Sequence, residues 1–388
     1  MVDLKKEIKL SDLVPRRKPK AAAARPTSSS GRPRKPTKRA LVGLKVGASQ
    51  IAAARIVNNG SANLLQLARG PLGAGIVVAG EVRDVPALAR ALDRFFAEHK
   101  LPRRGVRLGL ATNRIGVRGF DIDGIADERQ LANAIRFRAH EAVSIPIAEA
   151  AIDYHIVSEA VDDSGAISRH VVLAAAYRES IDRYVEACRA AKIELYGIDL
   201  EAFALLRAIG PATTGAEGDP ARAVVAVSLG HDRSTLAISD GAVCEFTRVL
   251  EWGGDKLEAA IALDLGITPD EAAELKLSVS LEPAPDADED ARLGAAREAI
   301  RRELQKLARE LVASLQFYQS QPGSLAISGI LLAGGTSRIP GLPEELERLT
   351  RVGVRRADPL AHVQATDEVK ARDDLASLAI AIGLGVEA

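Results

Sequence analysis

One pattern occurs twice in the chain and constrains its fold more than any other feature. A short apolar strand, a glycine turn, a second strand, an Asx-Gly pair and a third strand run from Leu41 to Ala68, and the same order runs from Ala223 to Val249. The two glycine turns begin at Gly47 and Gly230, 183 residues apart. Asx-Gly pairs between apolar runs are strong hairpin signals. A repeat of this size predicts two similar lobes that face each other, with a ligand cleft between the glycine turns.

A third glycine turn lies in the segment Gly329–Leu342. An apolar run the size of a buried strand, Ile330–Ala333, leads into Gly334-Gly335, and a helix is expected from about Pro343. Glycines let backbone N–H groups approach a ligand closely, and a helix N-terminus favours anions. An ordinary strand-to-helix turn has the same pattern, so these residues alone leave both interpretations open.

The remaining segments alternate between helical and strand patterns, which indicates an α/β protein. Thr268, followed by Pro269 and Glu271, has the spacing of a capping box. The apolar run Leu375–Val386 is predicted to be a buried helix. Further helices are expected at Pro86–Lys100, Glu128–Ala142, Arg178–Lys192, Leu200–Ala208 and Arg292–Gln319, and strands at Val106–Ala111, Asp153–Glu159 and His170–Ala176.

Composition excludes several classes of protein. The 388 residues allow two domains, and no run of about 18 apolar residues predicts a membrane span. No signal peptide is expected, and Cys188 and Cys244 lie far apart without the spacing of a metal site or a disulfide framework. These features favour a reducing, cytoplasmic location.

The neutral net charge hides an asymmetry. Residues 1–39 hold 13 Lys/Arg and 3 Asp/Glu, which leaves 39 Lys/Arg and 49 Asp/Glu for the rest of the chain. The proline-rich segment 1–39 is therefore predicted to be a disordered basic tail on an acidic body. It is expected to touch an anionic membrane or an acidic protein surface, without specific nucleic acid binding, or to serve only as a solubilising tail.

The two repeats, the segment Gly253–Lys276 and the motif ILLAGGTSRIPGL together resemble the actin-like ATPase superfamily. Within it, the chain is similar to the PilM family of type IV pilus assembly proteins, which are related to the division protein FtsA. The segments Ala134–Val157 and Val171–Ile209 resemble the small subdomain that PilM and FtsA share. The resemblance implies two facing actin-like lobes, 40–120 with the C-terminal helix 370–388 and 201–370, and an inserted subdomain at 121–200.

The resemblance also implies an ATP cleft between the lobes. The first phosphate loop, the second phosphate loop, the adenosine loop and the adenosine-side lysine of the family match segments of this chain in order. The cofactor-binding residues that follow are Lys45, Gly47, Ala48, Ser49, Gln50, Gly230, His231, Asp232, Gly254, Lys276, Gly334, Gly335, Thr336 and Arg338.

Two departures from the family pattern put catalysis in doubt. Lys45 stands where the first phosphate loop has a carboxylate, and Ser228 stands where the second strand has an aspartate. The family's aspartates organise Mg²⁺ and the attacking water, so the resemblance implies possible ATP binding with doubtful Mg²⁺ binding, no metal site and no assigned catalytic residue. Lys45 either pairs with phosphate directly or points to solvent in a decayed site.

Three functions follow from the resemblance. The first is a scaffold of a type IV pilus-type system with a degenerate ATP cleft, associated with the membrane's inner face by gripping the cytosolic tail of a PilN-like inner-membrane protein near residues 120–200. The second is an active ATPase whose carboxylates come from elsewhere, such as Asp232 and Glu251. The third is an FtsA-like filament protein anchored on the membrane by the basic tail.

Overall fold

The computed structural model describes residues 39–387, except 126, 144, 162–166, 210–221, 242 and 283–289. Nearly all of the predicted basic tail therefore lies outside the described residues. Among the residues that are described, no helix is long and apolar enough to cross a membrane.

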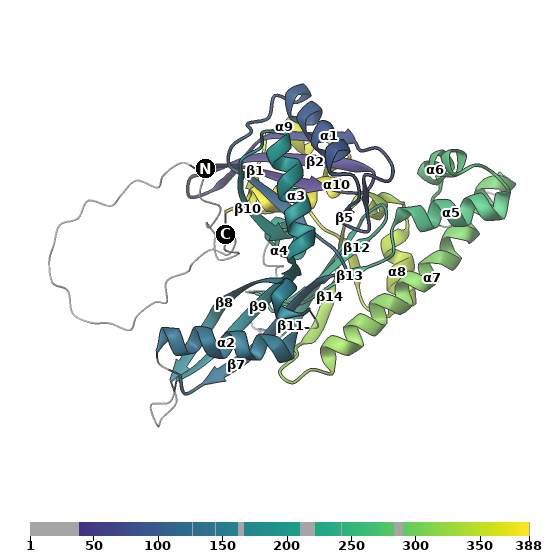
Figure 1. Ribbon diagram of the computed structural model, residues 1–388. Coiled ribbons are helices and arrows are strands. Elements are labelled where there is room, and N and C mark those ends of the chain that lie inside the picture. The colour runs from purple at the N-terminus through teal and green to yellow at the C-terminus, as the bar shows by residue number, and fades with distance from the viewer. Residues whose placement is uncertain are drawn as a thin grey trace.

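Two sheets form the centre of the molecule and share one topology (Figure 1). The first has the order β10-β6-β1-β2-β3-β16 and the second β13-β12-β11-β14-β15. In each, a three-stranded antiparallel meander continues through its first strand into two parallel strands. The predicted internal repeat is thereby confirmed. The strands are β1 Arg39–Val46, β2 Gln50–Asn58, β3 Ala62–Pro71, β6 Val106–Leu110, β10 Leu195–Leu200, β16 Val363–Gln364, β11 Arg222–Leu229, β12 Ser234–Ser239, β13 Cys244–Leu250, β14 Ala326–Ala333 and β15 Val354–Arg356.

Helices cover both sheets in layers. On the outer face of the first sheet lie α1 (Val85–Glu98) and α3 (Arg178–Ala190), and together they form the first lobe. The outer face of the second sheet carries α5 (Gly254–Leu265), α6 (Pro269–Ser278), α7 (Ala291–Gln319) and α8 (Leu342–Thr350), which complete the second lobe. Between the sheets lie α4 (Glu201–Ile209) and α10 (Leu375–Gly385).

Glycines allow the central helices to pack closely. A Cβ atom added at Gly383 of α10 would lie 1.7 Å from the carbonyl oxygen of Ala204 in α4, and one at Gly43 of β1 would lie 2.1 Å from that of Ala381. No side chain fits at such distances, so the α4–α10 layer depends on these two glycines.

A third, smaller unit projects from one end of the molecule (Figure 1). Its antiparallel sheet has the order β7-β9-β8, from β7 (Ile115–Asp123), β8 (Ala150–Val161) and β9 (Ile167–Tyr177). The helix α2 (Glu128–Ala142) packs on this sheet over a core cluster of its own. We call this unit, residues 115–177, the inserted unit. Its His170 lies 3.8 Å from Glu245 of β13 and 2.7 Å from Asp121, and so connects the unit to the second lobe.

Most predicted helices and strands are confirmed, including the capping box of α6, in which the Thr268 side chain accepts from the Glu271 N–H. Several elements, most of them short, were not predicted. These are β7, β10, the hairpin β4 (Val77–Val78) and β5 (Glu81–Val82), β15, β16, the 3-10 turns η2 (Ile147–Glu149) and η3 (Gly335–Arg338), and α9 (Asp367–Lys370).

Candidate functional site

The two repeated glycine turns close in the same way. At the end of β1, the Gly47 N–H donates to the Gln50 carbonyl oxygen at 2.9 Å, and at the end of β11, the Gly230 N–H donates to that of Arg233 at 3.1 Å. Ala48 and Ser49 complete the first turn and are half-buried, whereas His231 in the second turn is exposed. The equivalent hydrogen bonds follow from the repeat, because each turn joins two antiparallel strands of matching register.

Side chains from both lobes meet between these turns. Arg233 donates to the Val46 carbonyl oxygen at 3.4 Å, and Asp232 accepts from the Ala79 N–H at 2.8 Å. Val46 and Ala79 belong to the first lobe, whereas Asp232 and Arg233 belong to the second. The predicted phosphate turns therefore face each other across the interface between the lobes.

Four charged residues form a buried group at this interface, which we call the ion cluster: Lys45, Glu201, Asp232 and Arg233. Glu201 begins α4 and is 2 % exposed; its carboxylate lies 3.7 Å from the Lys45 ammonium and 4.0 Å from the Arg233 guanidinium. Arg233 also pairs with Asp232 at 3.1 Å. Lys45 is thus turned inward onto a carboxylate, which corrects the alternative that it points to solvent.

Arg233 keeps its charge in this buried position. Burial by itself would lower the pKa of its guanidinium, but the negative charges of Glu201 and Asp232 outweigh burial and the net shift of the pKa is upward. The ion cluster therefore places two basic side chains, Lys45 and Arg233, opposite the carboxyl groups of Glu201 and Asp232.

The ends of β1 and β11 offer Mg²⁺ no carboxylate, and the carboxylates of Glu201 and Asp232 are already paired with Lys45 and Arg233. Mg²⁺ needs oxygen ligands, chiefly carboxylates, whereas β1 supplies the cation Lys45 and β11 supplies the hydroxyl of Ser228, which is buried and pairs in register with Thr235. Over the described ranges, no group of three or more His, Cys, Asp or Glu residues could hold a metal ion.

Several predicted residues of the adenosine side come together around Gly230. The Gly254 N–H donates to the Gly230 carbonyl oxygen at 2.9 Å, and the Thr336 hydroxyl donates to the same oxygen at 3.1 Å. Lys276 lies 3.5 Å from the Gly254 carbonyl oxygen and forms an ion pair with Glu258. Four segments of the second lobe therefore converge on one small surface beside the ion cluster.

The two glycines at the end of β14 have different structural roles. Gly334 adopts a positive φ of 89°, and an added Cβ would lie 2.2 Å from the Leu229 carbonyl oxygen, so only glycine lets this turn pack on the end of β11. Gly335 starts η3, and its nearest neighbour to an added Cβ is the Ser377 side chain at 3.9 Å.

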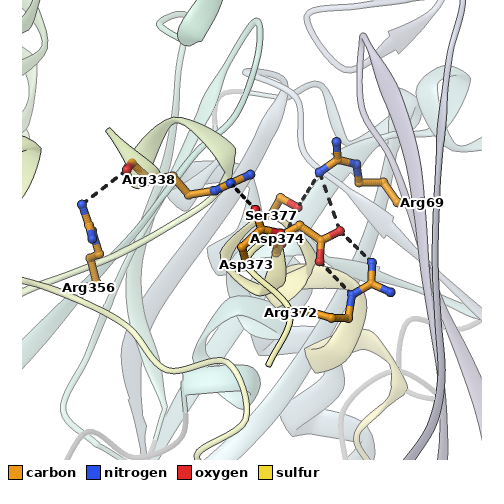
Figure 2. A network of polar contacts seen from close by, with 7 residues as sticks. All are labelled: Arg69, Arg338, Arg356, Arg372, Asp373, Asp374 and Ser377. Carbon is orange, nitrogen blue, oxygen red and sulfur yellow. Dashed lines mark hydrogen bonds and ion pairs between the residues drawn. The ribbon is translucent and has the colours of Figure 1, made fainter. Parts of the chain in front are cut away.

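Arg338 takes part in a different network, which connects the lobes (Figure 2). Its guanidinium donates to Asp373 at 2.9 Å, and the adjacent Asp374 binds Arg372 through both carboxylate oxygens. Arg69 of β3 reaches the same Asp374 at 3.8 Å. Arg338 thus engages the segment that leads into α10 through its side chain.

Sequence reasoning missed Glu201, Arg233 and Glu258. Glu201 and Asp199 are two acidic residues inside an otherwise apolar segment, and such residues are rarely buried without a partner, which is the signal that could have indicated Glu201. Asp232 and Glu251, the carboxylates considered for an active ATPase, are engaged elsewhere: Asp232 with Ala79 and Arg233, and Glu251 with Asn113.

Two adjoining cavities lie where the inserted unit meets the first lobe. The first, of about 280 Å³, and the second, of about 360 Å³, share Asn113 and Arg114. The Arg114 guanidinium carbon sits 3.8 Å from the centre of the Tyr177 ring, in cation–π contact. The first cavity is otherwise lined by Ala79, Glu81, Val82, Arg83, Glu179, Arg183 and Glu251, and the second by Ile115, Gly116, Arg118, Val143, Ile145 and Tyr177.

Comparison with solved structures places this arrangement among actin-like ATPase folds. A PilM–PilN type IV pilus biogenesis complex matches with a TM-score of 0.74 and 24 % identity, covering 90 % of this chain and 99 % of that chain. MreB5 of Spiroplasma citri bound to AMPPNP matches with a TM-score of 0.52 and 12 % identity, covering 89 % of this chain and 94 % of that chain. The ethanolamine utilization protein EutJ from Carboxydothermus hydrogenoformans matches with a TM-score of 0.51 and 15 % identity, covering 90 % of this chain and 90 % of that chain. These likenesses establish the fold.

The family is established by the sequence. The model of the family described as type IV pilus assembly protein PilM matches residues 43–388, which include both glycine turns, the inserted unit and α10. The chain therefore belongs to the PilM family of type IV pilus assembly proteins.

Proposed function

We propose that this chain is a cytoplasmic scaffold of a type IV pilus-type assembly system, which holds the cytosolic tail of a PilN-like inner-membrane protein. Membership of the PilM family and the likeness to a PilM–PilN complex support this proposal. The observation that carries it is the pair of adjoining cavities between the inserted unit and the first lobe. Holding a membrane protein's tail there would keep the scaffold at the inner face of the membrane.

The cavities have the chemistry of a peptide site. The second cavity combines apolar side chains of Ile115, Val143 and Ile145 with Arg114 and Arg118. Pockets of this size with an apolar lining and a few polar groups hold one or two anchoring side chains, while the polar groups set orientation. Because β7 is an edge strand of its sheet, its backbone also offers hydrogen bonds to an extended segment.

The test uses a fluorescent peptide of the PilN-like tail and measures its anisotropy with the full chain. Gly116 lines the second cavity, and an added Cβ would lie 3.6 Å from the Val143 side chain, an ordinary contact, so Gly116→Leu adds bulk to the lining without a clash at its Cβ. We expect at least about tenfold weaker binding. Ala160→Leu places the same leucine side chain at an exposed position of β8 and serves as control. Equal affinity for the wild type and Gly116→Leu would overturn the proposed peptide site.

We further propose that the ATP cleft is degenerate. Lys45 and Ser228 replace the two acidic residues of the family, and Glu201 is neutralised by two cations. Calorimetric titration of ATP with and without Mg²⁺ is expected to give weak binding that does not depend on the metal. The variant with Lys45→Asp, Ser228→Asp and Arg233→Gln should gain Mg²⁺-dependent affinity. Tight, Mg²⁺-dependent binding and turnover by the wild type would establish an active ATPase instead.

The basic tail is proposed to touch an anionic surface near the membrane. With 13 Lys/Arg in residues 1–39, its binding to vesicles of anionic lipid should fall steeply between low and high salt. A chain without residues 1–38 is the matched control. Vesicle binding that ignores salt, or that persists without the tail, would contradict this role.

A further inference from the structure

We propose that the ion cluster is a permanent clamp, which holds the two lobes closed in place of a bound nucleotide and metal. This inference rests on the proposed degenerate cleft and adds how such a cleft stays shut. The whole cluster is built from the chain's own side chains, so closure requires no ligand.

The contacts of the cluster join three parts of the molecule. From the second lobe, Arg233 reaches the Val46 carbonyl oxygen of the first lobe at 3.4 Å. Asp232, in the same turn, accepts from the Ala79 N–H at 2.8 Å. Glu201, from the helix layer between the sheets, lies between Lys45 of the first lobe and Arg233 of the second. Opening the cleft would break all of these contacts at once.

The charges of the cluster balance without a ligand. Lys45 and Arg233 carry two positive charges, and Glu201 and Asp232 carry two negative charges. Arg233 and Glu201 are almost fully buried, with 7 % and 2 % of their side chains exposed. Separating the lobes would leave buried ions without their partners until water entered, which is costly. A Mg²⁺ ion entering the closed cluster would add two uncompensated positive charges.

Part of the clamp is held by charge without a hydrogen bond. Glu201 Oε1 and Arg233 Nε are buried without a hydrogen-bond partner, although Oε1 faces the Arg233 guanidinium at 4.0 Å. Removing the Arg233 charge should therefore weaken closure, which makes Arg233→Gln the informative change. The shorter glutamine also removes the hydrogen bond from Arg233 to the Val46 carbonyl oxygen.

The clamp also fixes one wall of the first cavity. Ala79 lines that cavity and has a positive φ of 51°, a conformation that few residues other than glycine adopt. Its N–H is the group that donates to Asp232. Closure by the ion cluster therefore keeps this wall in place in the free protein, so the cavity is formed before any partner arrives.

Hydrogen–deuterium exchange of the full chain tests the clamp without a partner. In the nucleotide-free wild type, peptides covering 46–50 and 77–82 should be protected, and Mg²⁺-ATP should leave their exchange unchanged. Arg233→Gln should speed exchange in both peptides by at least about tenfold. Arg302→Gln removes an exposed ion pair with Asp264 on the second lobe and should change neither peptide.

Each outcome decides the matter. Peptides that become protected only after ATP is added to the wild type would overturn the clamp, and so would unchanged exchange in a folded Arg233→Gln. Should that variant fail to fold by circular dichroism, Asp232→Ala replaces it, because Asp232 is 17 % exposed and its truncation removes both the acceptor of the Ala79 N–H and the partner of Arg233. Peptide binding and ATP turnover are measured in separate assays. The exchange experiment therefore still tests the clamp if the proposed function proves wrong.

Discussion

The pairing of Lys45 with Glu201 makes a quantitative prediction. Lys45→Met removes the ammonium and keeps most of the side-chain volume, and Glu201→Gln removes the carboxylate charge. The two single variants and the double variant form a cycle that isolates the energy of this pair from the other effects of each change. This coupling energy shows whether the Lys45 ammonium lies against Glu201 or in solvent.

The distance sets the size of the expected coupling. Two unit charges 3.7 Å apart attract by about 4 kcal/mol at an effective dielectric constant of about 20. Relaxation of the variants reduces this, so we expect a coupling of about 1–3 kcal/mol. Lys45→Met alone should be milder than usual for a buried pair, about 1–2 kcal/mol, because Arg233 still faces Glu201 at 4.0 Å.

Urea unfolding followed by the fluorescence of Trp252 provides the assay. Trp252 is the only tryptophan, is 3 % exposed, and directly precedes Gly253-Gly254 beside the cleft. Circular dichroism must give the same transition for each variant, because two lobes can unfold separately. A coupling below about 0.5 kcal/mol would refute the reasoning, because the Lys45 ammonium would then lie in water rather than against Glu201.

Three further predictions concern other positions. Gly254→Ala puts a methyl group 2.7 Å from the Thr336 hydroxyl and 3.1 Å from the Lys276 ammonium. Both side chains can move, so the variant should fold but bind ATP about tenfold more weakly in calorimetry. In contrast, the methyl group of Gly334→Ala meets the Leu229 backbone, so this variant should give little folded protein on a gel-filtration column. Burial raises the pKa of the Cys188 and Cys244 thiols to about 12, so both should react with a thiol reagent only after unfolding, and rapid reaction of the native chain would contradict their burial. Burial also raises the pKa of Glu245 above its ordinary 4.5, so the stabilisation that its protonated form provides is present below pH 4.5 and is lost as the pH rises through the pKa of the folded state. The melting temperature of Glu245→Gln relative to wild type should therefore increase from pH 4 to pH 7. A difference in melting temperature that does not change with pH would count against this.

The repeated architecture could be predicted because its signals are local. Asn59-Gly60 and Asp240-Gly241 each mark a tight turn, and the apolar runs around them have strand length. No such signal marks β10, because this strand is defined by its parallel pairing with β6, which lies almost ninety residues earlier in the chain. The hairpin β4-β5 has only two residues in each strand and no apolar period to detect.

The candidate site was predicted in part for the same reason. Gly230, Gly254, Lys276 and Thr336 were singled out by their motifs, and the structure brings them into contact. What the motifs could not give is the partner of Lys45. Glu201 is 156 residues away in sequence, and only the stacking of α4 between the two sheets brings its carboxylate to the end of β1. Charge pairs of this kind depend on the whole fold and leave no local pattern.

The ion cluster explains how this cleft tolerates the loss of two acidic residues. Lys45 alone at a buried position between the lobes would be a positive charge without a partner. Because Ser228 replaces an aspartate, one fewer carboxylate is available nearby to pair with the Lys45 ammonium. Arg233 adds a second cation, yet the cluster balances because Glu201 and Asp232 each face it. Exchange of a single member breaks the balance, so the four residues act as one unit. This is why we expect restoration of Mg²⁺-dependent binding to require a change at Arg233 together with Lys45→Asp and Ser228→Asp: the two aspartates alone would pair with Arg233, and the metal would remain excluded.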